Sequence, residues 1–347
     1  MEENEEMIKM DQQERKQFWD VLCSLKGFDI QSESEKLKNA ITIPRHLYRY
    51  RAVSLSTIDA LQQKRMFFSN ANYYDDPFDT LLHIDFAKIR DEGKRFLSSE
   101  KIKEQIQSFF SIGIMDSKIT ENLVNAIENI DHDEIIDAAI GFLKQNIQLL
   151  LKEKLWTACF AESGDNETMW LKYADQYKGF CLVYDLQDSA SDLCGKQEKC
   201  LNCVVNKAGV SIYPVYYSDE GYDATEYAKS LAASYMVQQI GNNIRLPKEV
   251  INTIVPPVQS QMWQPERITL IKSKCHEYDR EWRMILRDNS TPPVMKEWIP
   301  AGVILGLRVT DRNKDIIIRS AKMAEIAHIY ESFISDKYKL EHREKEC

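Results

Sequence analysis

The strongest constraint on the fold of this chain is that its short strand-like segments are separated by irregular loops. Helical spacing of apolar residues predicts helices in the first 40 residues, at 226–254, at 263–272 and at 314–327. Alternating or apolar runs typical of strands occur at residues 44–51, 65–69, 156–160, 179–184, 213–217, 278–286 and 301–307. Strict alternation of strands with helices is absent. We therefore expect an α+β fold with a mixed, short-stranded β core rather than a doubly wound parallel sheet.

A helical block at about residues 85–155 interrupts this predicted core. Residues 133–151 carry an apolar stripe at helical spacing. The sequence thus predicts three parts: an N-terminal helical segment at 1–43, an α+β domain at 44–310 that contains the helical insertion, and a C-terminal helix with a charged tail at 311–347.

Composition and missing motifs exclude several functional classes. The net charge of −9 argues against broad non-specific binding to a nucleic-acid backbone. No apolar window approaches the length of a membrane span, and the acidic start lacks the features of a secretory signal. Glycine-rich phosphate loops, nucleophile elbows and zinc-protease helices are also absent from the sequence. We expect a cytoplasmic protein with no membrane partner.

The densest charge pattern lies at residues 278–286. Side chains alternate between the two faces of a strand, so Asp279, Glu281 and Arg283 are expected to share one face. A carboxylate and an arginine two positions apart can reach the same ligand. The structural alternative is a surface strand with a salt-bridged pair.

Residues 48–51, Tyr-Arg-Tyr-Arg, form a second candidate site. On a strand, Arg49 and Arg51 share one face and the two tyrosines share the other. Arginine suits phosphate because its planar fork donates two parallel hydrogen bonds, and tyrosine suits a flat ring. An edge strand with inward-packed tyrosines explains the same pattern without a ligand.

A third candidate is the pair Trp170 and Tyr173, which lie three positions apart on a predicted helix. Residues at this spacing share a helix face, so the two rings can line a pocket together. They can equally fill the hydrophobic core.

Metal sites are not expected. Asp75, Asp76 and Asp79 surround a proline, but their spacing does not match an oxygen-rich calcium loop, and turn roles explain them. Cys194, Cys200 and Cys203 include one pair with zinc-like spacing. A structural zinc site needs four ligands, which Cys275 and His276 could complete only through the fold, so free thiols are the favoured interpretation.

Several motifs in one order give the chain a family resemblance. They lie at residues 47–51, 67–70, 75–79, 159–160, 169–174, 179–181 and 278–283. The set resembles the bacterial domain-of-unknown-function family 2971, over roughly residues 44–310. Two positions depart from the usual motifs: Asp75 replaces an Asn, and Arg49 replaces a Lys. The family's name carries no activity.

A second resemblance, at the level of the fold, is to the ADP-ribosyltransferases. It implies NAD as substrate and Glu281, on a late strand, as the catalytic residue. Cleavage of the nicotinamide–ribose bond builds positive charge on the ribose, which a fixed carboxylate stabilises. The substrate-binding residues that we predict are Arg49, Arg51, Tyr50, Ser69, Tyr73, Trp170, Tyr173 and Arg283.

These resemblances leave three functions open. The first is an NAD-consuming transferase or glycohydrolase with a protein or nucleic-acid acceptor, acting as an effector in bacterial toxin or antiphage systems. The second is a non-enzymatic module whose Tyr, Arg and Trp residues bind a nucleotide or a protein. The third is a metal-dependent nuclease using Asp75, Asp76, Asp79 and Glu281. The sequence also leaves open a homo-oligomer or a partner in an effector complex.

Overall fold

A computed structural model describes residues 9–27, 29–74, 76–80, 82–98, 116–152, 155–186, 212–254, 263–287 and 294–345, with isolated positions between 104 and 113. The chain divides into two compact units. Unit 1 comprises residues 1–80, 152–220 and 265–347, and unit 2 comprises residues 81–151 and 221–264. The predicted N-terminal and C-terminal segments both fall in unit 1. Cys194, Cys200 and Cys203 lie outside the described residues.

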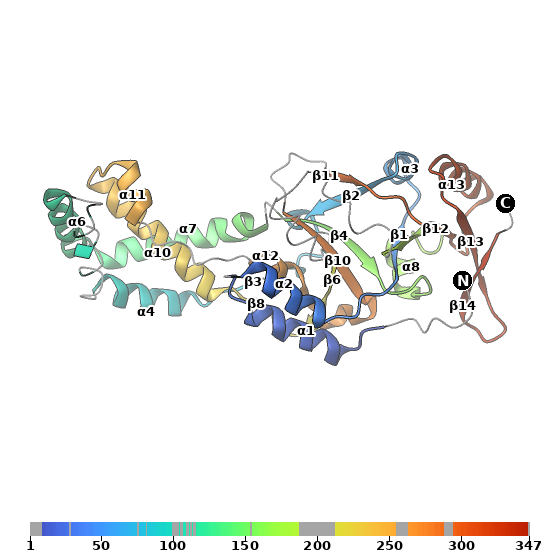
Figure 1. Cartoon of the computed structure of the whole chain (residues 1–347), viewed down its shortest axis with the longest axis horizontal. Coiled ribbons are helices and arrows are strands. Elements are labelled where there is room, and N and C mark those ends of the chain that lie inside the picture. Colours follow the sequence, from blue (N-terminus) through green and yellow to red (C-terminus); the bar gives the residue numbers. More distant parts are fainter. Residues whose placement is uncertain are drawn as a thin grey trace. The chain divides into compact units, whose positions relative to one another are not determined.

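Unit 1 is built on a ten-stranded mixed sheet (Figure 1). Its main path runs through β11 (Val294–Glu297), β2 (Arg65–Asn70), β4 (Leu155–Ala161), β1 (His46–Arg51), β5 (Phe180–Asp185), β12 (Gly302–Leu305), β13 (His328–Ile334) and β14 (Leu340–Glu344). Off this path, β10 (Glu281–Arg287) pairs with β4 and with β6 (Ile212–Pro214). The β12–β13 pairing is parallel, whereas β1, β4 and β10 pair antiparallel. Together with the helices, this sheet confirms the α+β class.

The helices of unit 1 start where the sequence supplies caps. Asp11 forms a capping box with Glu14 at the start of α1. The helix α3 is capped by Ser54, whose extended backbone and side-chain oxygen suit an N-cap. The helices of this unit are α1 (Gln12–Ser24), α2 (Ile30–Asn39), α3 (Leu55–Gln62), α8 (Glu167–Tyr173) and α13 (Asp311–Met323), while α12 (Gln264–Thr269) begins at the boundary.

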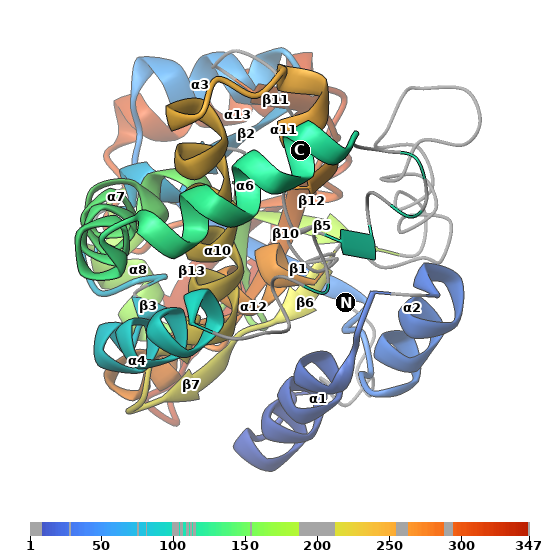
Figure 2. The same cartoon turned by 90° about the vertical axis from the view of Figure 1, so that its left-hand side faces the viewer.

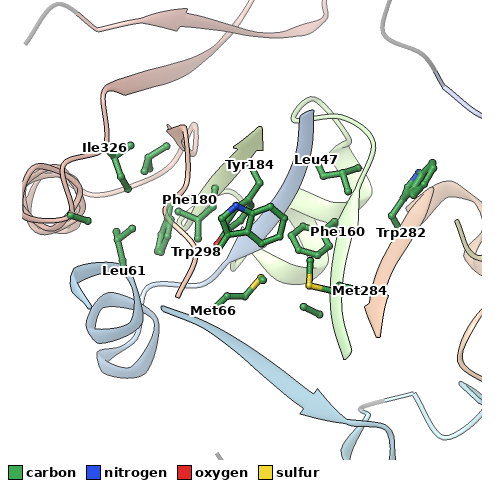
Figure 3. Close-up of a cluster of buried hydrophobic side chains, with 14 of the residues drawn as sticks. Leu47, Leu61, Met66, Phe160, Phe180, Tyr184, Trp282, Met284, Trp298 and Ile326 are labelled. Carbon is green, nitrogen blue, oxygen red and sulfur yellow. The ribbon is translucent and has the colours of Figure 1, made fainter. Parts of the chain in front are cut away.

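Two hydrophobic clusters cover the two faces of the sheet, and β1 contributes to both. Leu47 packs into the larger cluster with Phe160, Tyr184 and Trp298, which are drawn in Figure 3. Tyr48 and Tyr50 pack into the cluster on the opposite face. The alternation predicted for residues 48–51 is therefore confirmed: the tyrosines lie on one face and the arginines on the other.

Unit 2 is helical. It contains α4 (Phe86–Leu97), α6 (Ser117–Asn129), most of α7 (His132–Lys152), α10 (Thr225–Asn243) and α11 (Lys248–Ile254), with the strand pair β3 (Leu82–His83) and β8 (Tyr222–Asp223). Apolar residues of α4, α6, α7 and α10 form one core, and Figure 2 shows α7 nearly end-on beside α4 and α10. The helical block predicted from the sequence thus shares its core with residues 221–264, whose helix at 226–254 was predicted but was placed outside the insertion.

Three local differences from the sequence expectations matter for the site. Asp279 ends the 3-10 helix η2 (Lys274–Asp279), Arg280 adopts a left-handed backbone, and β10 begins only at Glu281. The predicted helix at 263–272 ends at Thr269 and is followed by the strand β9 (Ile271–Ser273), which pairs with β7 (Tyr216–Ser218). The predicted charged tail at the C-terminus contains the strand β14.

Within the described part of the chain, the helices are too short or too polar to cross a membrane.

Candidate functional site

Five charged side chains meet inside unit 1: Asp79, Lys272, Asp279, Glu281 and Arg283, which we call the charged network. They come from four places in the chain: the turn after the short 3-10 helix η1 (Ala71–Tyr73), β9, the end of η2, and β10. All five are buried. Burial of charges is costly unless they are paired, so this convergence marks the first candidate for a functional site.

Glu281 is held by two cations. Arg283 Nε donates to its Oε1 at 2.6 Å, and Lys272 Nζ donates to its Oε2 at 2.9 Å. Burial alone would raise the pKa of Glu281, but Arg283 and then Lys272 outweigh it and hold this pKa well below its usual range. The carboxylate is therefore ionised, and both of its oxygens are occupied.

Arg283 joins the far side of the network. Its guanidinium donates to both carboxylate oxygens of Asp79, at 2.9 and 2.5 Å, and to the Thr269 carbonyl at 2.7 Å. This is the fork geometry that makes arginine–carboxylate pairs strong. The guanidinium also lies 5.2 Å from the ring centre of Tyr74. Asp79 and Glu281 raise the pKa of Arg283 despite its burial.

Asp279 connects the network to the surface. Lys272 contacts its Oδ2 at 3.3 Å, and Lys172 of α8 contacts its Oδ1 at the same distance. His276 lies between two carboxylates, with Nδ1 3.2 Å from Asp279 and Nε2 3.1 Å from Asp76. Both imidazole nitrogens are therefore committed to neighbouring side chains.

Two further groups border the network. Tyr173 interacts electrostatically with Lys272 and Glu281, yet 41% of its surface is exposed. Burial of its hydroxyl raises its pKa to about 12, so it can donate a hydrogen bond but not act as a base near neutral pH. The Cys159 thiol is also inert, because burial and then Glu281 raise its pKa to about 12.

Arg49 and Arg51 do not join Glu281. Ala161 of β4 pairs with both Tyr48 and Glu281, so Tyr48 and Glu281 share a sheet face. Arg49 and Arg51 point to the other face, where the guanidinium of Arg49 lies 5.8 Å from the ring centre of Phe160. The expectation that an arginine of β1 and Glu281 hold one ligand is thus corrected: the strand pairing separates them.

Tyr50 and Trp170 fill the core. Trp170 is fully buried, donates from Nε1 to the Gly164 carbonyl at 2.7 Å, and stacks on Tyr177. The Tyr50 ring meets it edge-on at 5.2 Å, and the Tyr50 hydroxyl donates to the Ser163 carbonyl. Neither ring has a face open for a ligand. Of the pair Trp170 and Tyr173, only Tyr173 reaches the charged network.

Ser69 and Tyr73 are exposed, and no contact with the charged network is described for either. The neighbouring Tyr74, and not Tyr73, contacts the charged network: its hydroxyl forms a hydrogen bond with Thr157, and its ring lies next to the guanidinium of Arg283. Sequence reasoning also missed Lys272, because residues 263–272 were predicted as helix. The sequence feature that could have indicated the position of Lys272 is that it directly follows the apolar pair at 270–271.

The carboxylates of the network surround a lysine. Lys272 Nζ contacts Glu281, Asp279 and, at 3.8 Å, Asp79. Within the described residues, no group of three or more His, Cys, Asp or Glu side chains could hold a metal ion. Asp75, which the nuclease hypothesis needs, lies outside those residues.

Comparison with known proteins gives one match. No curated protein and no solved structure matches the chain. A family model described as a protein of unknown function (DUF2971) matches residues 169–284, a narrower range than the 44–310 expected from the motifs. The matched range includes Tyr173, Lys272, Asp279, Glu281 and Arg283. Four of the five residues of the charged network therefore lie in the part of the chain that is similar to this family.

Proposed function

We propose that this protein is a non-catalytic module that binds a nucleotide beside the charged network. The observation that carries this proposal is the full engagement of Glu281 by Lys272 and Arg283. A carboxylate that stabilises a developing charge on a ribose must face the reacting carbon. In Glu281 both oxygens instead face cations of the same chain.

The surface next to the network suits a nucleotide. It consists of Lys172 and Tyr173 on α8 with Tyr278 on η2, and we call it the α8–η2 rim. Tyr173 and Tyr278 are 41% and 77% exposed, and the Lys172 side chain is 42% exposed. Tyrosine rings stack on bases, which contributes about 1–3 kcal/mol per base, and a lysine ammonium attracts phosphate.

The charged network fixes this rim in place. Lys172 is tied to Asp279, which the buried Lys272 also holds. Asn166, the N-cap of α8, donates to the Tyr278 carbonyl at 2.6 Å. A rigid rim loses little conformational entropy when a ligand binds, so the network contributes to affinity without touching the ligand.

NAD consumption remains a second candidate because of one observation. Lys272 and Arg283 keep Glu281 ionised, and the partly exposed Tyr173 interacts with the same carboxylate. A fixed, ionised carboxylate can stabilise the positive charge that develops on the ribose when NAD is cleaved. A role as a bacterial defence effector rests on the family resemblance alone.

Calorimetric titration of the purified protein with ATP and with NAD tests the proposal. We expect binding by the wild type and a 5- to 150-fold loss of affinity for Tyr173→Ala, which is about 1–3 kcal/mol of lost stacking. Tyr338→Ala is the matched control, since Tyr338 is an exposed tyrosine on the turn between β13 and β14. Absence of nucleotide binding, or an equal loss in both variants, would overturn the proposal.

A parallel assay separates the two candidates. Nicotinamide release from NAD is followed for the wild type and for Glu281→Gln. Binding without release supports the module, whereas release by the wild type alone would replace it with the NAD-consuming enzyme.

A further inference from the structure

Among the residues that the structure describes, Arg49 is a buried cation without a countercharge. Only 6% of its surface is exposed, and one guanidinium nitrogen donates to the Phe67 carbonyl at 2.7 Å. Its Nε has no hydrogen-bond partner. Within the described part of the chain, no carboxylate lies within ion-pair distance of Arg49 or of Arg51. An unpaired buried guanidinium is costly, so this arrangement calls for an explanation.

The other buried arginines of unit 1 show how this protein treats such groups. Arg15 pairs with Glu162 at 2.5 Å, and Arg283 pairs with Asp79 and Glu281. Both are as deeply buried as Arg49. Among the fully buried arginines that the structure describes, Arg49 is thus the one without a carboxylate partner.

Arg51 adds a second positive charge at the same place. It lies two residues further along β1, so it shares the sheet face of Arg49, and it is only half-buried. Burial, and then repulsion by Arg51, lower the pKa of Arg49 to about 9. The two guanidiniums thus form a concentrated positive charge, and Arg51 is the less buried of the two residues.

The aromatic neighbours of Arg49 add another unused donor. Phe160 lies next to Arg49 and also next to Trp298, with ring centres 5.9 Å apart. Trp298 and Tyr184 lie side by side with ring centres 4.7 Å apart, as Figure 3 shows. Trp298 Nε1 is buried without a hydrogen-bond partner. The unsatisfied atoms of Arg49 and Trp298 are both N–H donors, so a group that completes them must be an acceptor.

We propose that Arg49 and Arg51 form a binding site for a phosphate group, on the sheet face opposite the charged network. A phosphate is favoured over a carboxylate because two guanidinium forks supply more donors than two carboxylate oxygens accept. The phosphate is either free or part of a small phosphorylated molecule. This site is separate from the α8–η2 rim and does not depend on the proposed function.

Thermal unfolding in phosphate tests the site. A ligand that binds the folded state raises the unfolding temperature progressively with its concentration. We expect this rise for the wild type in sodium phosphate, compared with sodium chloride and sodium acetate at the same ionic strength and pH. A small phosphorylated molecule, ribose 5-phosphate, is titrated in parallel, and tighter binding than that of inorganic phosphate would identify the source.

Three variants make the test specific. Arg51→Met, at the half-buried position, is expected to weaken the apparent phosphate affinity at least tenfold. Arg49→Lys keeps the positive charge but loses the two parallel N–H donors of the guanidinium, so this variant is also expected to bind phosphate more weakly. Arg65→Met removes an exposed arginine from β2 and is expected to respond as the wild type does.

The stability of Arg49→Met gives a second readout. In phosphate-free buffer this variant is expected to unfold at the same temperature as the wild type or higher, because it removes an unpaired buried charge. In phosphate buffer the wild type is expected to unfold at a higher temperature than Arg49→Met. The proposal is overturned if the wild type unfolds at the same temperature in phosphate and in chloride, as when water alone satisfies these donors. It is also overturned if Arg51→Met responds to phosphate like Arg65→Met.

Discussion

Removal of Lys272 is the sharpest test of the charged network. Lys272→Met keeps most of the side-chain volume but removes the ammonium that contacts Glu281 at 2.9 Å and Asp279 at 3.3 Å. The three carboxylates are then left with one buried cation, Arg283, and with the partly exposed Lys172 on Asp279. Breaking a buried ion pair by removing one partner costs about 3–5 kcal/mol, and we expect a loss of this size in the free energy of unfolding.

Urea denaturation followed by tryptophan fluorescence measures this loss. Five of the six tryptophans lie in unit 1, so the signal reports mainly on the unit that holds the network. Lys172→Met is the matched control: it removes another lysine from Asp279, but from a partly exposed position, where the expected cost is below about 1 kcal/mol. Equal losses of stability in Lys272→Met and Lys172→Met would contradict this role of the buried ammonium.

A double variant checks that the cost comes from the unpaired carboxylates. Glu281→Gln in the Lys272→Met background removes one of the charges left without a partner. The two changes are in direct contact, so their effects should not add, and we expect a coupling energy of about 0.5–3 kcal/mol. Additive losses would show that Lys272 acts independently of Glu281.

Other predictions concern pH and packing. Because the pKa of Glu281 is lowered by folding, its ion pairs contribute stability above about pH 4.3, and this contribution is lost as the pH falls toward the lowered pKa; the gap in urea midpoint between wild type and Glu281→Gln should therefore narrow from pH 7 to pH 3. Gly179→Ala would place a Cβ 2.1 Å from the Arg51 carbonyl oxygen, and we expect a loss of about 3 kcal/mol or more by urea denaturation, whereas Gly141→Ala, in an open stretch of α7, should be neutral or stabilising by about 0.5–1 kcal/mol. Trp170→Ala should cost about 3–5 kcal/mol, since it empties a fully buried site in the core.

Local periodicity predicted which residues share a face within a strand. The tyrosines and arginines at residues 48–51 separate as expected, and Glu281 and Arg283 do share a face. A strand's own sequence defines its two faces because the pleat has a period of two residues. It does not say which face of one strand meets which face of another. That depends on the pairing of β4 with both β1 and β10, which places Arg49 and Glu281 on opposite sides.

Residues from short elements were hardest to predict. Lys272 lies on a three-residue strand that gains its conformation from pairing with β7, so the local sequence resembles the end of a helix. Asp279 reaches the network from a 3-10 helix, and the left-handed Arg280 turns the chain into β10. The burial of Trp170 likewise depends on Tyr50 and Tyr177, which are distant in sequence or lie beyond its helix. Tertiary contacts decide all three positions.

We propose that the α8–η2 rim beside Glu281 binds a nucleotide without cleaving it. One experiment tests both parts: incubation of the wild-type protein with NAD, with bound NAD measured by calorimetry and released nicotinamide by chromatography. We expect saturable binding of NAD, weakened by Tyr173→Ala, and no nicotinamide above a protein-free control. Nicotinamide release by the wild type that is abolished in Glu281→Gln would contradict it, and so would the absence of binding.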